Sequence, residues 1–443
     1  MSSSAVARPG AFFRVLQKVV AVQPEELPAV GWCWVYAFSL LAANYILTPI
    51  RDQMGVAGGV RNLPWLFAGT LAGTILLNVP FGWLVKKLPR SRFIPLTYRF
   101  FALVLLLFGV AMHFATKEQS VWVGRCFFIW VSVANLFAIS VFWQLNVDLF
   151  SPGQGKRLFG FIAAGATIGA IVGSAYISIL AKQVSPVWLL ISAAVLFEVA
   201  VFCAGRLGRL SPALHRLPAA EIAQTEERPD ERPVGGNMLA GIYHAVRSPY
   251  LLGVSLFLLL YSVTSTFVYS QQAAIVAHDL TDRAAQTVFF SNINFGVNTV
   301  ALVLQLFFTG RIVLTLGVAL ALAILPVITM GGFAALAVTP TLTVIAVFQV
   351  IRRGIEYAIT RPAREVIYTV VSREDRFKTK GFIDTFVYRL GDQVGVWSSA
   401  IFTGIGASVA PIAAIGIAVV WLFTALWLGG QQRKREAEQA VPA

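Results

Sequence analysis

The stretches Ser151-Pro-Gly-Gln-Gly-Lys-Arg-Leu-Phe-Gly-Phe-Ile162 and Ser372-Arg-Glu-Asp-Arg-Phe-Lys-Thr-Lys-Gly-Phe-Ile383 decide the fold. Their serine and their Gly-Phe-Ile recur at a constant offset of 221 residues, which is half the length of the chain. Both stretches are basic and both lead into an apolar segment. The match predicts two similar halves, one following the other in the sequence. The alternative is a chance similarity between two basic loops.

The composition excludes a soluble globular enzyme and a disordered chain. Of the 443 residues, 57% are hydrophobic and only 13% are charged, whereas a soluble domain carries about 25% charged residues. The mean hydropathy is +0.73. These values predict an all-α protein that crosses a membrane many times.

Twelve apolar stretches are long enough to span a bilayer as helices. They are residues 28–50, 63–85, 94–115, 121–145, 158–181, 186–205, 249–273, 285–309, 312–336, 341–365, 381–405 and 410–429. The order is six spans, a polar linker and six spans, which is typical of a transporter built from two bundles. We therefore expect a segment 1–27, a bundle 28–205, a linker 206–248, a bundle 249–430 and a tail 431–443.

The distribution of Lys and Arg predicts the orientation. With both termini cytoplasmic, the inner segments carry 23 Lys and Arg, the outer segments carry 5, and 7 lie within spans. Positive residues are enriched on the cytoplasmic side of membrane proteins. This asymmetry explains most of the net charge of +14, so the charge is no argument for a nucleic-acid partner.

The loop after the second span resembles a loop of the major facilitator superfamily. It reads Gly82-Trp-Leu-Val-Lys-Lys-Leu-Pro-Arg-Ser-Arg92, and the family pattern is Gly-x-Leu-x-Asp-Arg-x-Gly-Arg-Arg. Lys86 stands at the position of the Asp, so a gating role of that acid does not carry over. The resemblance implies the major facilitator fold, with two six-helix bundles and both termini cytoplasmic.

Charged residues within the spans are concentrated in the second half. Ionised side chains at this depth are costly and usually face a bundle interior or a wet cavity. In the tenth span Arg353, Glu356, Thr360 and Arg364 share a helical face, flanked by Arg361 and Glu365; in the eleventh, Asp384, Tyr388 and Asp392 share a face beside Arg389.

We expect these two faces to meet across a central cavity. Arg353, Arg361 and Arg389 are the candidate anion ligands, and Glu356 and Asp384 pair with Arg353 and Arg389 when the anion is absent. Asp384 and Asp392 are the candidate ion-coupling residues. The alternative is a set of salt bridges that only holds the bundles together.

Each of the other polar residues in the spans has two alternative interpretations. Arg51 at the end of the first span is a candidate outer gate, or it reaches to the external interface. Glu198 in the sixth span has no basic residue one turn away, and is either a neutral acid bonded to a neighbouring helix or a proton-coupling site. Tyr269, Asn294 and Asn298 either bind a polar solute or link helices.

Glycines at a spacing of four in the fifth span predict close helix packing. They are Gly165, Gly169 and Gly173, and small residues at this spacing let two helices touch. The four histidines lack partners at metal-ligand spacing. No phosphate-binding glycine loop, nucleophile elbow or zinc motif is present, so we expect no enzyme, no ATP-hydrolysing pump, no metal and no cofactor.

Four stretches resemble bacterial relatives of the ATP/ADP translocase (nucleotide transporter) family, a branch of the major facilitator superfamily. They are Leu47–Val56, Phe142–Gln144, Gln154–Ile162 and Arg361–Asp384. The resemblance implies an inner-membrane exchanger of phosphorylated nucleosides. No Lys lies in the middle of a span, so the phosphate ligands would be Arg353, Arg361 or Arg389, which grip oxygens in bidentate fashion.

The sequence thus predicts a monomeric secondary transporter in the bacterial inner membrane. It moves an organic anion, with a nucleotide as one candidate, by alternating access. Proton-coupled transport of another polar or amphipathic solute, through Glu198, Asp384 or Asp392, is the alternative. A membrane protein that handles lipid or binds a partner without transport is a third hypothesis.

Overall fold

The computed structural model describes residues 22–214, 248–371, 379–406 and 408–440, and in these ranges it contains helices and no strands. Most of the expected segment 1–27 and of the expected linker 206–248 lies outside the described residues. So do residues 372–378 of the second basic loop and the last three residues of the tail.

The first half consists of long, regular helices. They are α2 (Leu27–Ala57), α3 (Leu63–Lys87), α4 (Arg90–Phe114), α5 (Lys117–Leu149), α6 (Pro152–Leu180) and α7 (Pro186–Leu214), with a 3-10 turn at Val60–Asn62. Ser151, the serine of the first basic loop, caps α6 in a reciprocal capping box with Gln154. Such a box satisfies two free amides at a helix start, and so the quoted loop fixes where α6 begins.

The described part of the second half contains four long helices, one of which is kinked at Gly317, and two segments interrupted by π turns. The long helices are α9 (Pro249–Asp279), α10 (Arg283–Phe307), α11 (Thr309–Val338) and α16 (Val409–Ala440). The expected tenth span is divided into α12 (Leu342–Ile355), a π-helical turn η2 (Glu356–Thr360) and α13 (Arg361–Ile367). The expected eleventh span contains the π-helical turn η3 (Ile383–Val387) followed by α15 (Tyr388–Ile405).

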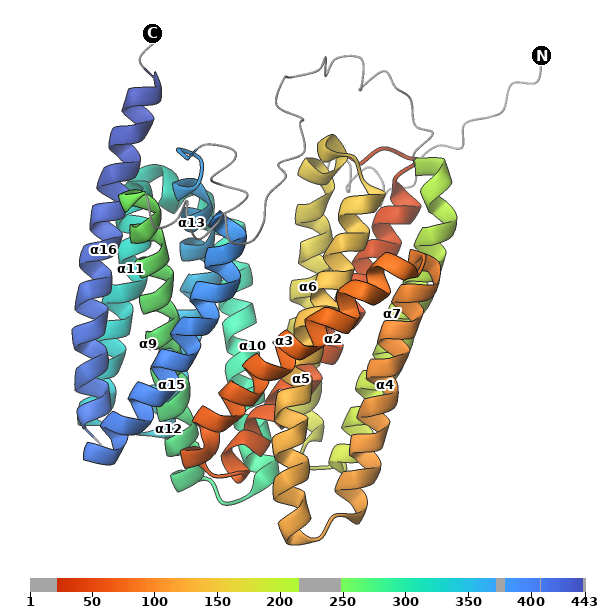
Figure 1. The fold of residues 1–443 in the computed structure, drawn as a ribbon, viewed down its shortest axis with the longest axis horizontal. Coiled ribbons are helices and arrows are strands. Elements are labelled where there is room, and N and C mark those ends of the chain that lie inside the picture. Colours follow the sequence, from red (N-terminus) through yellow and green to blue (C-terminus); the bar gives the residue numbers. More distant parts are fainter. Residues whose placement is uncertain (1–21, 215–247, 372–378, 407, 441–443) are drawn as a thin grey trace.

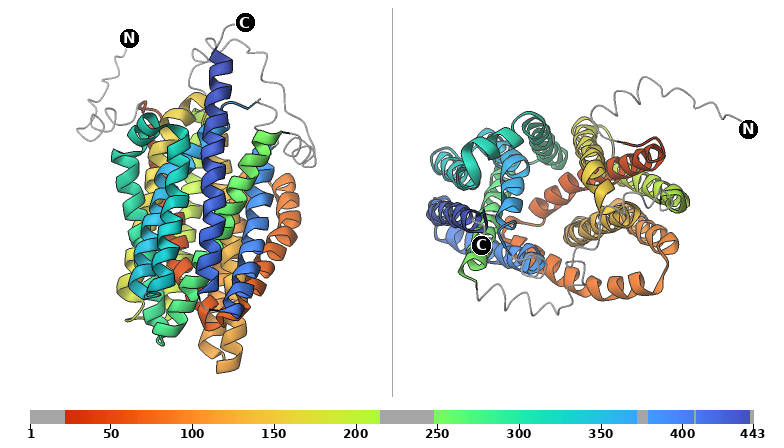
Figure 2. Two further views of the ribbon diagram at one scale, coloured as in Figure 1. Left: turned by 90° about the vertical axis from the view of Figure 1, so that its left-hand side faces the viewer. Right: turned by 90° about the horizontal axis from the view of Figure 1, so that it is seen from above.

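Ten of the described helices are long and apolar enough to cross a membrane. The tenth and eleventh expected spans fall short of that criterion because charges and π turns interrupt them. Together the helices form the polytopic all-α fold that the sequence predicts, arranged in two groups (Figures 1 and 2).

The helix pairings of the first half recur in the second. In the first half α2 packs on α6 and α4 packs on α7; in the second, α9 packs on α15 and α11 packs on α16. Glycines allow the close α2–α6 contact, because a Cβ added at Gly169 or Gly173 would overlap the backbone of Phe38 or Ala42. The structure confirms the close packing predicted from the glycine spacing.

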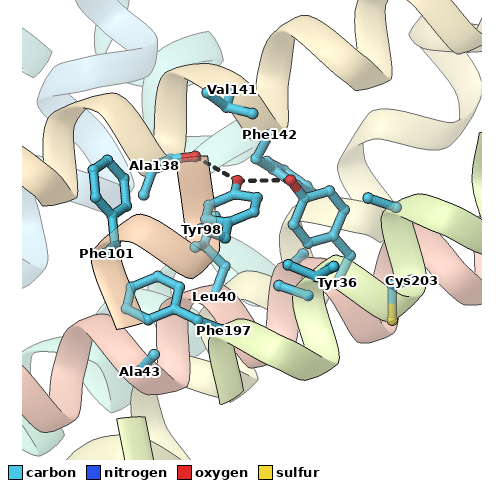
Figure 3. Close-up of a cluster of buried hydrophobic side chains, with 14 of the residues drawn as sticks. Tyr36, Leu40, Ala43, Tyr98, Phe101, Ala138, Val141, Phe142, Phe197 and Cys203 are labelled. Carbon is cyan, nitrogen blue, oxygen red and sulfur yellow. Dashed lines mark hydrogen bonds between the residues drawn. The ribbon is translucent and has the colours of Figure 1, made fainter. Parts of the chain in front are cut away.

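The first half is built around one apolar core that spreads over its helices. At its centre Tyr36 donates a hydrogen bond of 2.6 Å to the Tyr98 hydroxyl, which donates one of 2.9 Å to the carbonyl of Ala138 (Figure 3). Phe142 and Phe197 pack on these two rings. Both buried tyrosine hydroxyls thus have partners within the core, as buried polar groups require.

The two halves meet at one end of the molecule. We call this the outer end, because the Lys and Arg bias predicts that the opposite end, where α2 begins, is cytoplasmic. A cluster of buried side chains from both halves, the outer gate cluster, closes it: Val56, Leu63, Leu66, Phe128, Ala273, Val276, Phe290 and Val396. Toward the inner end the two groups of helices lie farther apart (Figure 1).

Hydrogen bonds between the halves lie in the outer part of the molecule. Arg283 donates to Ser120 at 3.2 Å, and Ser291 donates to the carbonyl of Ser174 at 2.6 Å. The described ion pairs at the inner end stay within one half, as Glu26–Arg157 and Lys380–Glu365 do. The chain therefore lies in a state that is closed outside.

Candidate functional site

A small polar chamber lies between the halves, below the outer gate cluster. Its volume is about 140 Å³, and α2 supplies one wall while α9, α10 and α12 supply the other. Thr48, Arg51, Asp52, Ser265, Tyr269, Gln272, Phe290, Ile293, Asn294, Gln349 and Arg353 line it. The structure thus brings together four predicted site residues, Arg51, Tyr269, Asn294 and Arg353.

Arg353 is the cation of this chamber in the second half. Its guanidinium donates to the Asn294 Oδ1 at 2.9 Å and to the Tyr357 hydroxyl at 3.3 Å. No carboxylate of the described residues lies within salt-bridge distance of it. A guanidinium has five N–H donors, and so Arg353 retains donors for an oxygen ligand.

Arg51 is the cation in the first half, and a carboxylate already holds it. Its Nη2 lies 2.7 Å from the Asp52 Oδ1. The same oxygen accepts a hydrogen bond of 3.1 Å from the Tyr269 hydroxyl on α9. Asp52 therefore links the two halves at the outer boundary of the chamber, through one ion pair and one hydrogen bond.

A larger cavity of about 410 Å³ adjoins the chamber and shares Arg51, Ser265 and Tyr269 with it. Phe67, Phe128 and Tyr388 contribute rings to its wall, and Ser132, Asn135, Thr266, Arg389 and Asp392 contribute polar groups. Asp392 accepts a hydrogen bond of 2.6 Å from Ser262 and lies 3.4 Å from Arg389. The predicted residues Arg389 and Asp392 thus face a cavity as an ion pair.

The π turn η2 explains how Glu356 and Arg361 pair. In a π-helix the backbone bonds connect residues five apart, and the amide of Arg361 donates to the carbonyl of Glu356. The side chains follow the same spacing, with Arg361 Nε 2.8 Å from Glu356 Oε1. Glu356 is only 5% exposed and Arg361 is 55% exposed. Neither residue lines the chamber or the larger cavity.

The pairing of charges differs from the expected one. Glu356 pairs with Arg361 and Asp384 lies 3.9 Å from Arg364, whereas we expected both acids to pair with the anion ligands Arg353 and Arg389. The π turn is the reason, because it places Arg361 over Glu356. The ion pairs that join the tenth and eleventh segments, Arg364–Asp384 and Lys380–Glu365, lie at the inner end and not across the cavity.

Two arginines in this region have no carboxylate partner among the described residues, Arg352 and Arg353. Arg352 is 1% exposed, donates to the hydroxyls of Thr329, Ser265 and Thr264, and lies over the Tyr261 ring. Arg51, Arg361, Arg364 and Arg389 each have an acidic partner. The interior thus carries a surplus of two positive charges, and its described residues hold no group of His, Cys, Asp and Glu suited to a metal.

Three further predicted residues lie away from the cavities. Asn298 donates to the carbonyl of Asn294 at 2.8 Å, which supports α10 rather than a solute. Asp384 lies at the inner end, beside Arg364. Glu198 is not the unpaired acid that we expected, because Arg99 on α4 lies 3.2 Å from it. Spacing along one helix does not reveal a partner that a neighbouring helix supplies.

Several groups that line the site are not among the predicted site residues. They are Thr48, Asp52, Gln272 and Gln349 in the chamber, and Phe67, Phe128, Ser132 and Asn135 in the larger cavity. Gln349 donates a hydrogen bond to Gln272. A signal existed for Asn135 and Ser132, because they stand 221 residues before Glu356 and Arg353.

The chain matches the profile of a known protein family. The family profile described as Major Facilitator Superfamily matches residues 31–376. No curated protein matches the chain.

Solved transporter structures share the fold. A bacterial homologue of the human lysosomal transporter Spinster, solved in an inward-facing and unoccupied conformation, has a TM-score of 0.54 at 15% identity over 93% of this chain and 99% of its own. A POT family transporter in complex with 5-aminolevulinic acid has a TM-score of 0.59 at 10% identity, over 92% and 96%. The nucleoside transporter NupG has 0.53 at 14% identity, over 92% and 99%. Identities this low show the fold alone.

Proposed function

The chain belongs to the major facilitator superfamily, and we propose that it is a secondary transporter that moves an organic anion by alternating access. Membership in this transporter family agrees with the prediction that the chain is a multi-pass membrane protein and not an enzyme. A nucleotide is one candidate solute, with exchange as the mode. The bacterial inner membrane is the proposed location.

The observation that carries this proposal is Arg353. It lies between the halves, faces a chamber that both halves line, and has no acidic partner among the described residues. Arg353 is half-buried, and a cation that is partly removed from water without a counter-charge is costly. An anion that enters the chamber removes that cost, which favours anionic over neutral or cationic solutes.

The two adjoining spaces suit a ligand with a charged head and a flatter body. The small chamber offers guanidinium and amide groups to an oxyanion. The larger cavity offers the rings of Phe67, Phe128 and Tyr388. Their combined size falls within the range of about 300–1,000 Å³ that is typical of small-molecule sites.

The outer closure supports alternating access. The outer gate cluster and the Asp52–Tyr269 hydrogen bond must separate before a solute can enter from outside. Ion pairs at the inner end stay within each half among the described residues, so they do not oppose movement of one half against the other.

A thermal-shift screen of the purified protein tests the proposal. The panel contains nucleotides, other phosphorylated metabolites, carboxylates, and neutral nucleosides as controls. A ligand at 100 times its Kd adds about 2.7 kcal/mol of stability, so a true substrate raises the unfolding temperature. The best compounds are then tested for counterflow in proteoliposomes. Stabilisation by neutral or cationic compounds only would contradict the proposal.

Proton-coupled transport of another solute is the second candidate, and Asp392 favours it. This acid is buried, lines the larger cavity and bonds to Ser262. Exchange continues when a protonophore collapses the proton gradient, whereas coupled uptake stops. Replacing Asp392 by Asn separates the two mechanisms, because only coupled uptake requires a titrating group at this position.

A further inference from the structure

An ion pair on the membrane-facing surface of the first half has no role in the proposed transport cycle. Arg99 on α4 and Glu198 on α7 are 3.2 Å apart, and their side chains are 62% and 48% exposed. Arg99 lies about 14 Å along α4 from its first residue, and Glu198 lies about 18 Å along α7. Since the hydrocarbon core is about 30 Å thick, both groups lie well within it.

Such a position is unusual for charged groups. Ionisable side chains in spans almost always face the bundle interior or a wet cavity, because charge in hydrocarbon is costly. Mutual pairing neutralises the two charges but leaves N–H and carboxylate groups turned toward lipid. A further polar surface would satisfy those groups.

The surroundings of the pair form a continuous face. On α4 the exposed side chains of Leu103, Leu106 and Val110 follow Arg99 at helical spacing, and on α7 Trp188, Val195 and Phe202 lie in line with Glu198. We call these residues the α4–α7 face. A groove of about 450 Å³ runs between the two helices toward the outer end.

We propose that a second copy of this chain docks on the α4–α7 face. One cation and one anion side by side form a self-complementary patch. In a two-fold arrangement Arg99 of each copy meets Glu198 of the other, and four charges share their hydrogen bonds away from lipid. Ridges of exposed side chains on one copy fill the groove of the other.

A second copy fits this face better than lipid does. Acyl chains fill an apolar groove but offer no donor or acceptor to an ion pair. The charged part of a phospholipid lies at the interface, outside the hydrocarbon core. An unrelated partner would need an ion pair of its own at the same depth, and a second copy brings one by symmetry.

Docking on this face is compatible with movement of the halves. The helices α4 and α7 pack on other helices of the first half, and the contacts between halves involve α2, α3, α6, α9, α10 and α15. A pair of copies joined through their first halves would leave both second halves free to move. The proposed arrangement differs from the monomer that the sequence predicts.

Cysteine cross-linking in native membranes tests the proposal. The three native cysteines, Cys33, Cys126 and Cys203, are first replaced by Ala. L103C and V195C then place a thiol on the α4–α7 face, and F423C places one at an exposed position on α16 as the matched control. With a flexible bismaleimide we expect dimers from L103C or V195C and none from F423C. Cross-linking at both face positions no stronger than at F423C overturns the proposal.

A charge-reversal pair gives a second test. R99E makes the patch wholly acidic and E198R makes it wholly basic, so each variant repels its own copies. When the two variants carry different tags and are produced together, they attract. We expect recovery of the mixed dimer to exceed self-association of either variant by at least about tenfold. If the mixed dimer is recovered no better than the self-associated variants, the Arg99–Glu198 pair acts only within one chain and the proposal fails.

Discussion

The helices of the basic repeats show the greatest contrast between the two halves. In the first half α5 and α6 are regular α-helices, and in the second the matching segments are interrupted by the π turns η2 and η3. Val131, Ser132, Asn135 and Ser140 of α5 stand 221 residues before Arg352, Arg353, Glu356 and Arg361. Every one of those four charges has a neutral counterpart.

The contrast shows that a shared scaffold carries different chemistry in each half. The first half contributes a single apolar core, a few hydroxyl and amide groups and the Arg51–Asp52 ion pair to the cavity walls. The second half contributes most of the charges and divides its core into separate clusters around them. Since π turns often occur at functional sites, η2 and η3 agree with binding chemistry in the second half.

Replacing Arg353 by Ala should reduce transport more than any other change proposed for the two halves. Removal of one partner of a fully buried charged contact costs about 2–5 kcal/mol. Arg353 is half-buried, so we expect the lower end of this range and a fall in anion counterflow of about 30-fold. The matched control is Ser132→Ala, at the equivalent position of α5, where we expect a loss below about threefold. Wild-type counterflow in a well-folded R353A protein would show that the anion binds elsewhere.

The Glu356→Gln variant tests whether the π turn depends on its ion pair. Hydrogen bonds to charged groups contribute about 1.5–3 kcal/mol, and the half-exposed Arg361 lowers that to about 1–2 kcal/mol. Thermal unfolding in detergent should shift down by several degrees. Asn135→Ala, the matched change in α5, should shift it less. In the double variant E356Q/R361Q part of the loss should return, and strict additivity would mean that the pair is not coupled.

Tyr269→Phe removes a link between the halves without changing a charge. Loss of one hydrogen bond costs about 0.5–1.5 kcal/mol, so the outer end should open about 2- to 10-fold more often. The readout is the rate at which an impermeant maleimide labels V276C, a position within the outer gate cluster. Tyr250→Phe, which loses a bond to Ile367 within the second half, is the control. Equal rates in both variants would contradict the assignment of Tyr269.

Glu198→Gln should have the smallest effect on transport. Glu198 lies on the α4–α7 face and lines neither cavity, so counterflow should stay within about twofold of wild type. The measurement is repeated with a protonophore. Abolished uptake in E198Q alone would move the coupling site to the first half.

The sequence predicts the architecture well because long apolar stretches leave little choice but to span. The glycine spacing of α6 even predicts local detail, the close contact with α2. The site is predicted in part: Arg51, Tyr269, Asn294, Arg353, Arg389 and Asp392 line cavities. The pairing of Glu356 was not predictable from a period of 3.6, because η2 has a longer backbone period.

The sequence pattern of one segment also does not reveal hydrogen-bond or ion-pair partners that a neighbouring helix supplies. Arg99 pairs with Glu198 across 99 residues of sequence, and Tyr269 reaches Asp52 across 217. Hydrophobic pattern fixes which segments span but not how each helix is rotated against its neighbours. The contacts that define the cavity wall depend on that rotation.

The two arginines without acidic partners have an electrical consequence. One elementary charge that crosses a membrane potential of 100 mV gains or loses about 2.3 kcal/mol. With an inside-negative potential, an empty carrier bearing Arg352 and Arg353 would be drawn to the state that places them nearest the cytoplasm. A doubly charged anion would cancel that bias. Voltage dependence of counterflow therefore measures how many charges the cargo brings.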